Sequence, residues 1–196
     1  GSPTSAEYYG GMGLAPMLAS GPPFPLIGKT IETWRAAAAA AGHATDARMP
    51  IQVITVVEET DEKAMEAART YLPLFGQAQV EHYRIDTTDW ESIPGYESFK
   101  KSFGVIKRLA DPANMDKIAP HLLVGSPDTV NERLEQLVEL GLDKFMIYTA
   151  MPGIPREVRQ GWASNFAKHV APAFSARFRC CLLYTSDAAD DVGCVG

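Results

Sequence analysis

Short runs of β-branched and apolar residues alternate along this chain with longer segments whose apolar residues recur at helical spacing. The short runs predict strands at Leu14–Leu18, Ile51–Val57, His121–Val124 and Lys144–Thr149. The longer segments predict helices at 2–13, Ile27–Ala41, Asp61–Leu72, Leu74–Tyr83, Glu97–Arg108, Pro127–Leu140 and Arg156–Ala171. Strand and helix in this alternation favour right-handed βαβ units and therefore an α/β fold with a parallel sheet.

Capping residues and prolines set several of these expected boundaries. Thr60 is a good N-cap for the helix that follows it, and Gly42 and Gly141 are typical of helix C-termini. Pro73 is expected to stop one helix, with the next segment continuing it after a kink. Pro16 interrupts the first strand.

Composition and charge narrow the class of protein. The chain has 196 residues, of which 46% are hydrophobic and 21% charged, so it is not dominated by disorder. This length suggests one domain, yet it falls short of the roughly 200 to 400 residues of a complete (β/α)8 barrel. The net charge is −6 with scattered lysines and arginines, which argues against nucleic acid as a partner. No apolar run approaches the roughly 18 to 20 residues of a membrane span, so no membrane partner is expected.

The three cysteines, Cys180, Cys181 and Cys194, all lie in the last 17 residues. The body of the chain therefore has no disulfide framework and no thiolate metal site, and a reducing, cytoplasmic location is expected. Residues Cys181–Asp191 read CLLYTSDAADD, which resembles an in-frame translation of a sequencing-library adapter. We predict that residues 180–196 are a non-native tail, the alternative being a natural cysteine-bearing C-terminus.

The first helix start is a candidate phosphate site. Ser2, Thr4 and Ser5 supply hydroxyl groups there, beside free backbone N–H groups and the positive end of the helix dipole. Ordinary N-capping by Ser2, with no ligand, is the alternative interpretation.

Two further loops follow predicted strands. The loop VGSPDT at 124–129 has Ser126 in the position of an N-cap, and a tight turn without ligand is the simpler interpretation. The loop at 150–155 offers Met151 and Ile154 as candidate walls of a site.

The widely spaced histidines, His43, His82, His121 and His169, show no metal-binding pattern, and no metal is expected. His82 is kept as a weak site candidate, whereas His121 at a strand start is interpreted as structural. The segment Arg84–Pro120 is long and irregular, and such segments are typically functional or inserted over a site.

The order of these motifs resembles the C-terminal half of the bacterial luciferase-like monooxygenase family. The most specific parts are SPTSAEYYGGMGL at 2–14 and VGSPDTV followed by LVELGLDKFMI at 124–147. The resemblance spans about residues 1 to 175 and implies a (β/α)8 TIM barrel that binds reduced FMN or, in some branches, a deazaflavin. Residues 1–179 would be a partial barrel domain holding about strands 6–8, with 84–120 as the family's variable segment over the barrel mouth.

The resemblance also assigns site residues. In the luciferase-like branch an acidic residue, a serine and a later hydroxyl residue hold the FMN phosphate, and Ser2 and Ser5, with Thr4 between them, match this loop. Gly1 stands at the acidic position, which is a departure from the family pattern. Strands one to five, and with them the catalytic residues including a histidine, would lie upstream of this sequence.

The resemblance implies a metagenomic fragment of a flavin-dependent monooxygenase that oxygenates a small organic molecule with O2. A separate reductase would supply reduced FMN, and the parent enzyme would be a dimer. The fragment alone is expected to be inactive, because an open half-barrel exposes strand edges and apolar faces. The alternatives are a deazaflavin-dependent oxidoreductase of the same superfamily and a non-catalytic flavin-binding protein.

Overall fold

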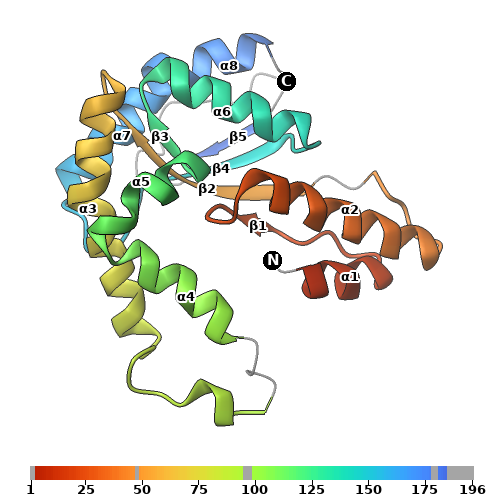
Figure 1. Ribbon diagram of the computed structural model, residues 1–196. Coiled ribbons are helices and arrows are strands. Elements are labelled where there is room, and N and C mark those ends of the chain that lie inside the picture. The colour runs from red at the N-terminus through yellow and green to blue at the C-terminus, as the bar shows by residue number, and fades with distance from the viewer. Residues whose placement is uncertain (1–2, 47–48, 95–98, 178–180, 185–196) are drawn as a thin grey trace.

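The computed structural model describes residues 3–46, 49–94, 99–177 and 181–184, which form a five-stranded parallel sheet with packed helices (Figure 1). The strands are β1 (Leu18–Ala19), β2 (Pro50–Val57), β3 (Leu123–Gly125), β4 (Lys144–Tyr148) and β5 (Cys181–Tyr184). The α-helices are α1 (Pro3–Gly11), α2 (Phe24–Ala40), α3 (Asp61–His82), α4 (Phe99–Leu109), α5 (Met115–Ile118), α6 (Pro127–Glu139), α7 (Arg156–Asn165) and α8 (Ala171–Arg177). Short turns of other helix types are η1 (Trp90–Ser92), η2 (Pro112–Asn114), η3 (Ala119–His121) and η4 (Phe166–Val170). The predicted α/β class with a parallel sheet is confirmed.

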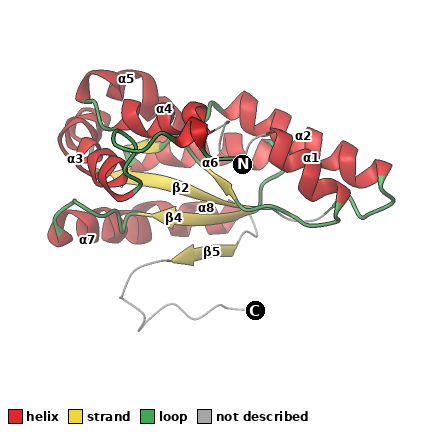
Figure 2. Cartoon of the chain, turned by 90° about the horizontal axis from the view of Figure 1, so that it is seen from below, coloured by secondary structure: helices red, strands yellow, loops and turns green. Residues whose placement is uncertain are grey.

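Strand β2 is the centre of the sheet. Its residues 51–52 pair with β1, residues 50–54 with β4, and residues 55–57 with β3, all in parallel. Figure 2 shows β2, β4 and β5 following one another. Strand β3 is only three residues long, and β2 pairs directly with β4 along residues 50–54, before the part of β2 that pairs with β3.

Both faces of the sheet are covered, because alternate residues of β2 point to opposite sides. Ile51 and Val53 belong to one core, which contains residues of α2 and α6. Val56 belongs to a second core, which contains residues of α3, α5 and α7. Figure 1 shows α2 and α3 on opposite sides of β2. The expectation of exposed apolar faces is therefore wrong for β2: these three side chains are 0% exposed, because helices bury them on both faces of the strand.

The predicted boundaries hold best where a capping side chain is present. Thr60 accepts a hydrogen bond from the Lys63 N–H and starts α3. The expected stop at Pro73 does not occur, because α3 runs unbroken to His82 with Pro73 buried among its neighbours. The first predicted strand shrinks to Leu18–Ala19, since Pro16 has no N–H with which to extend the ladder.

The irregular segment Arg84–Pro120 forms an arm that reaches away from the sheet and returns to it (Figure 1). Its helix α4 packs along α3, and its helix α5 is tied to α3 by an ion pair between Asp116 and Arg69 at 2.5 Å. Lys107 forms a second ion pair with Asp86, which joins the two halves of the arm. The arm thereby lies beside the face of the sheet that α3 covers.

Strand β5 lies within the segment predicted to be a non-native tail. It extends the sheet in parallel beyond β4, with Cys181 opposite Lys144. Without β5, β4 would be an edge strand whose unpaired N–H and C=O groups can bond to any extended segment, and this is sufficient to explain the pairing of β5 with β4. The origin of residues 180–196 stays a prediction.

Candidate functional site

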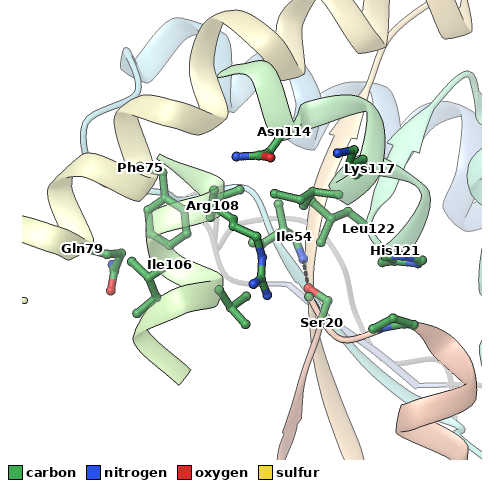
Figure 3. Close-up of a pocket in the computed structure, with 15 residues that line it drawn as sticks. Ser20, Ile54, Phe75, Gln79, Ile106, Arg108, Asn114, Lys117, His121 and Leu122 are labelled. Atoms are coloured by element: carbon green, nitrogen blue, oxygen red, sulfur yellow. Dashed lines mark hydrogen bonds between the residues drawn. The ribbon is translucent and has the colours of Figure 1, made fainter. Parts of the chain in front are cut away.

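A cavity of about 390 Å³ lies between β2, α3 and the returning arm (Figure 3). This volume is within the range of about 300 to 1,000 Å³ that is typical of small-molecule sites. Most of its wall is apolar and includes Ile54, Phe75, Leu109 and Leu122. The polar residues in the wall are Ser20, Gln79, Arg108, Asn114, Lys117 and His121.

The turn after β1 forms one side of the cavity. Ser20 is fixed to the neighbouring strand twice: its N–H donates to the Gln52 carbonyl at 2.8 Å, and its Oγ accepts the Ile54 N–H at 3.0 Å. Gly21 follows with φ = 124°, a backbone conformation that side chains rarely allow. The hydroxyl proton of Ser20 is not used in the bond to Ile54, so this group can still donate.

The opposite wall is held by Arg133 of α6. Its Nη1 donates to the carbonyl oxygens of Ala119, Leu122 and Val124, at 3.0, 2.9 and 2.5 Å. Burial lowers the pKa of Arg133, while Asp61 and Glu132 act in the opposite direction. One guanidinium thus fixes the backbone on both sides of His121, and the Ala119 carbonyl also accepts the Leu122 N–H at 3.0 Å.

The back of the cavity depends on a close approach of α3 and the end of α4. A Cβ added at Gly76 would lie 2.4 Å from the Ala110 N, so a larger residue does not fit this crossing. The ring of Phe75 packs edge-on against Tyr148 of β4, with centroids 5.8 Å apart. Burial raises the pKa of Tyr148, with Arg159 opposing that shift and Tyr83 adding to it.

The described part of the cavity wall carries positive charge and contains no acidic side chain. Arg108 and Lys117 are exposed, and neither forms an ion pair with a described residue. Two carboxylates of the arm have partners of their own: Asp111 accepts a hydrogen bond from the Asn114 side chain at 3.1 Å, and Asp116 forms an ion pair with Arg69 of α3. Such a wall attracts anions.

The predicted phosphate residues lie elsewhere, on α1. Thr4 is exposed and Ser5 is half-buried, while Ser2 lies outside the described residues. Neither Thr4 nor Ser5 belongs to the cavity wall. Helix α1 is held tightly to α2, because a Cβ at Gly10 would lie 2.5 Å from the Trp34 carbonyl oxygen.

The loop at 124–129 is a capping turn, as its simpler interpretation predicted. Ser126 Oγ accepts the Thr129 N–H at 3.4 Å, and the Asp61 carboxylate accepts the Ser126 N–H at 2.7 Å and the Thr129 hydroxyl at 2.9 Å. The bond from the Ser126 N–H is the main cause that lowers the pKa of Asp61, against a smaller opposing effect of burial. The anion position at the start of α6 is therefore occupied by a carboxylate of the chain itself.

The loop at 150–155 does not supply the expected walls. Met151 is 0% exposed and Ile154 4% exposed, and both belong to the second core with Trp162. Neither side chain lines the cavity described above, because both pack against residues of α3 and α7.

Of the two histidines considered above, His121 lines the cavity and His82 does not. His82 is exposed, packs against Tyr83 at a centroid distance of 4.9 Å, and does not line the cavity. His121 does line it and packs against Phe24 at 6.5 Å. Sequence reasoning also passed over Arg108 and Lys117, although both lie in the irregular segment expected over a site.

The described residues contain no group of three His, Cys, Asp or Glu residues placed to hold a metal ion. Among their helices, none has the length and apolar character that crossing a bilayer requires.

The fold and cavity define an α/β protein with a parallel sheet and a site of small-molecule size. A sequence model of the luciferase-like monooxygenase family matches residues 1–144, and the chain belongs to that family. No similarity to a curated protein sequence was detected.

Solved structures similar to the chain share its fold. Monooxygenase RslO1 from Streptomyces bottropensis is 20% identical with a TM-score of 0.56, and the match covers 88% of this chain and 46% of that one. The oxygenating constituent of 3,6-diketocamphane monooxygenase from Pseudomonas putida, solved with FMN, is 22% identical with a TM-score of 0.53, covering 86% and 45%. The coenzyme F420-dependent tetrahydromethanopterin reductase from Methanopyrus kandleri is 20% identical with a TM-score of 0.54, covering 88% and 48%. The chain thus spans less than half of each of these structures.

Proposed function

We propose that this chain is the C-terminal part of a flavin-dependent monooxygenase that oxygenates a small organic substrate with reduced FMN and O2. The observation that carries the proposal is the family match over residues 1–144, supported by the likeness in fold to a monooxygenase solved with FMN. A separate reductase would supply reduced FMN, and the complete enzyme would be a cytoplasmic dimer. Reduced flavin supplies the reaction with oxygen; the protein binds and orients its ligands and excludes water.

The start of α1 fits a phosphate group. Its first turn contains no acidic residue, its hydroxyl-bearing residue Thr4 is exposed, and Ser5 is half-buried. Free N–H groups at a helix start and nearby hydroxyls are the donors that phosphate requires. In the proposed enzyme Ser2, Thr4 and Ser5 would hold the FMN phosphate.

A deazaflavin is the second candidate cofactor. Two similar folds belong to enzymes named as F420-dependent, the reductase above and a secondary alcohol dehydrogenase that is 16% identical with a TM-score of 0.54. In that case the chain would belong to an oxidoreductase that transfers hydride instead of activating oxygen. A non-catalytic flavin-binding protein would bind FMN without either reaction.

The proposal is tested by titration of FMN and of riboflavin, which lacks the phosphate. Ser5→Ala and Thr4→Ala should each weaken FMN binding about tenfold and leave riboflavin binding unchanged, since only the phosphate contact is lost. Thr33→Ala is the matched control, because its hydroxyl is exposed and bonds only to the Lys29 carbonyl of its own helix. Equal FMN affinity in Ser5→Ala would remove the phosphate assignment, and tighter binding of F420 than of FMN would favour the deazaflavin enzyme.

We also propose that the 196-residue chain is inactive alone, because it spans less than half of the similar enzymes. Substrate oxygenation by this chain with FMN and a reductase would contradict that proposal.

A further inference from the structure

We propose that the cavity between β2, α3 and residues 105–122 binds an amphipathic organic anion, that is, a carboxylate carried on an apolar body. This proposal concerns a ligand site on the arm and does not depend on the flavin assignment, whose residues lie on α1. Three properties of the wall point to this ligand: an apolar interior, two cations without an ion-pair partner among the described residues, and the hydroxyl donor of Ser20.

The interior of the cavity suits a hydrocarbon body. Phe75, Leu109 and Leu122 are 7%, 8% and 0% exposed, so these walls are set in the core and do not swing freely into water. Phe75 is held by its edge-on contact with Tyr148, and Leu122 by the bond from Arg133 to its carbonyl. A pre-formed apolar wall of this kind gains free energy by covering the apolar surface of a ligand.

The polar part of the wall suits one negative charge. Arg108 comes from the last turn of α4 and Lys117 from α5, and both are exposed and without an ion-pair partner among the described residues. Figure 3 shows the guanidinium of Arg108 extending toward Ser20. A guanidinium binds a carboxylate through two parallel hydrogen bonds, which a lysine can supplement as a point charge.

Ser20 adds a neutral donor. Its Oγ is fixed by the Ile54 N–H at 3.0 Å, so its remaining capacity is the donation of its own proton. Among the acids of the arm, Asp111 bonds to Asn114, Asp116 pairs with Arg69 and Asp86 pairs with Lys107, and none of the residues that line the cavity is acidic. The ligand class that meets all three properties has an apolar body and a single anionic head.

The experiment uses the 196-residue chain and isothermal titration with octanoate, 1-octanol, inorganic phosphate and FMN. Octanoate should bind at least about tenfold more tightly than 1-octanol, which has the same chain and no charge. Arg108→Met and Lys117→Met should each weaken octanoate binding about tenfold and leave 1-octanol binding unchanged, since each removes a charge-assisted hydrogen bond and keeps an apolar side chain. Arg156→Met is the control, because Arg156 is an exposed arginine at the start of α7 that does not line the cavity.

Several results would overturn the proposal. One is equal affinity for octanoate and 1-octanol in the unsubstituted chain, a comparison that requires no variant to fold. Others are an equal loss of octanoate affinity in Arg156→Met and the absence of octanoate binding. The proposal is also overturned if inorganic phosphate or FMN displaces octanoate and Arg108→Met weakens FMN binding more than Ser5→Ala does. That result would identify the anion as a phosphate and not a carboxylate. Loss of FMN binding in Ser5→Ala, with octanoate unaffected, would leave this proposal supported and test the flavin assignment separately.

Discussion

The crossing of α3 with the end of α4 depends on the absence of a side chain at Gly76. Replacing Gly76 by alanine would place a Cβ 2.4 Å from the N and 2.6 Å from the Cα of Ala110, both backbone atoms that cannot rotate away. The two helices must then separate. Overpacking of this kind costs about 1 to 3 kcal/mol, from which the helix-propensity gain of roughly 0.5 to 1 kcal/mol must be subtracted. We expect a net loss of about 0 to 2.5 kcal/mol in the free energy of unfolding, whereas an uncrowded glycine in a helix should show a gain.

Gly161→Ala is the matched control. Gly161 lies in α7, is exposed, and would have no heavy atom within 4 Å of an added Cβ. This substitution should therefore stabilise the chain by about 0.5 to 1 kcal/mol. Urea unfolding followed by circular dichroism measures both variants, and octanoate titration reports whether the back of the cavity has opened. If Gly76→Ala is as stable as Gly161→Ala, the close approach of α3 and α4 is not present in solution and the argument fails.

Two further substitutions test the hydrogen bonds around the arm. Asp61→Asn should cost about 1 kcal/mol at pH 7, because the amide cannot accept from both the Ser126 N–H and the Thr129 hydroxyl. The pKa of Asp61 is lowered in the folded state, so this stabilisation is complete above pH 3.8 and is lost as the pH falls through the lower folded value. The free energy of unfolding, measured against pH, should therefore become equal for Asp61→Asn and the unsubstituted chain at low pH. A difference that stays constant with pH would refute the assignment. Arg133→Met should cost about 1 to 3 kcal/mol, because it removes the hydrogen bonds that the guanidinium donates to three carbonyl oxygens in 119–124. Thermal unfolding should place Arg133→Lys in between, and equal stability of all three proteins would show that Arg133 does not hold this segment.

The helices and strands with strong local signals could be predicted from the sequence. The stripe Val130, Leu134 and Leu137 is buried on α6 as its helical spacing indicates, and Ser126 caps that helix. The continuation of α3 through Pro73 could not be predicted, because burial of that turn in the second core outweighs the lost hydrogen bond. Pairing of β2 with β4 is a contact between residues about 90 positions apart, and no local pattern encodes it.

The cavity was beyond sequence reasoning for a different reason. Arg108 ends one predicted helix, Lys117 lies in the irregular stretch after it, and His121 begins a predicted strand, so nothing in their spacing relates one to another. Tertiary contacts bring them to β2: the glycine crossing at Gly76 positions the end of α4, and Arg133 fixes the chain on both sides of His121. The irregular sequence of the arm indicated that a site lies near this segment, but it did not indicate which of its residues line the site.

Two helix starts in this chain look alike as sequence, since each has hydroxyl residues before a helix and free N–H groups. The structure distinguishes them by what meets those N–H groups. At α6 the Asp61 carboxylate, delivered from the start of α3, accepts the Ser126 N–H at 2.7 Å. At α1 the first turn has no acidic residue and Thr4 is exposed. An anion at α6 would have to displace a bonded carboxylate whose charge repels it. Of these two helix starts, α1 is therefore the one that fits the phosphate of a cofactor better.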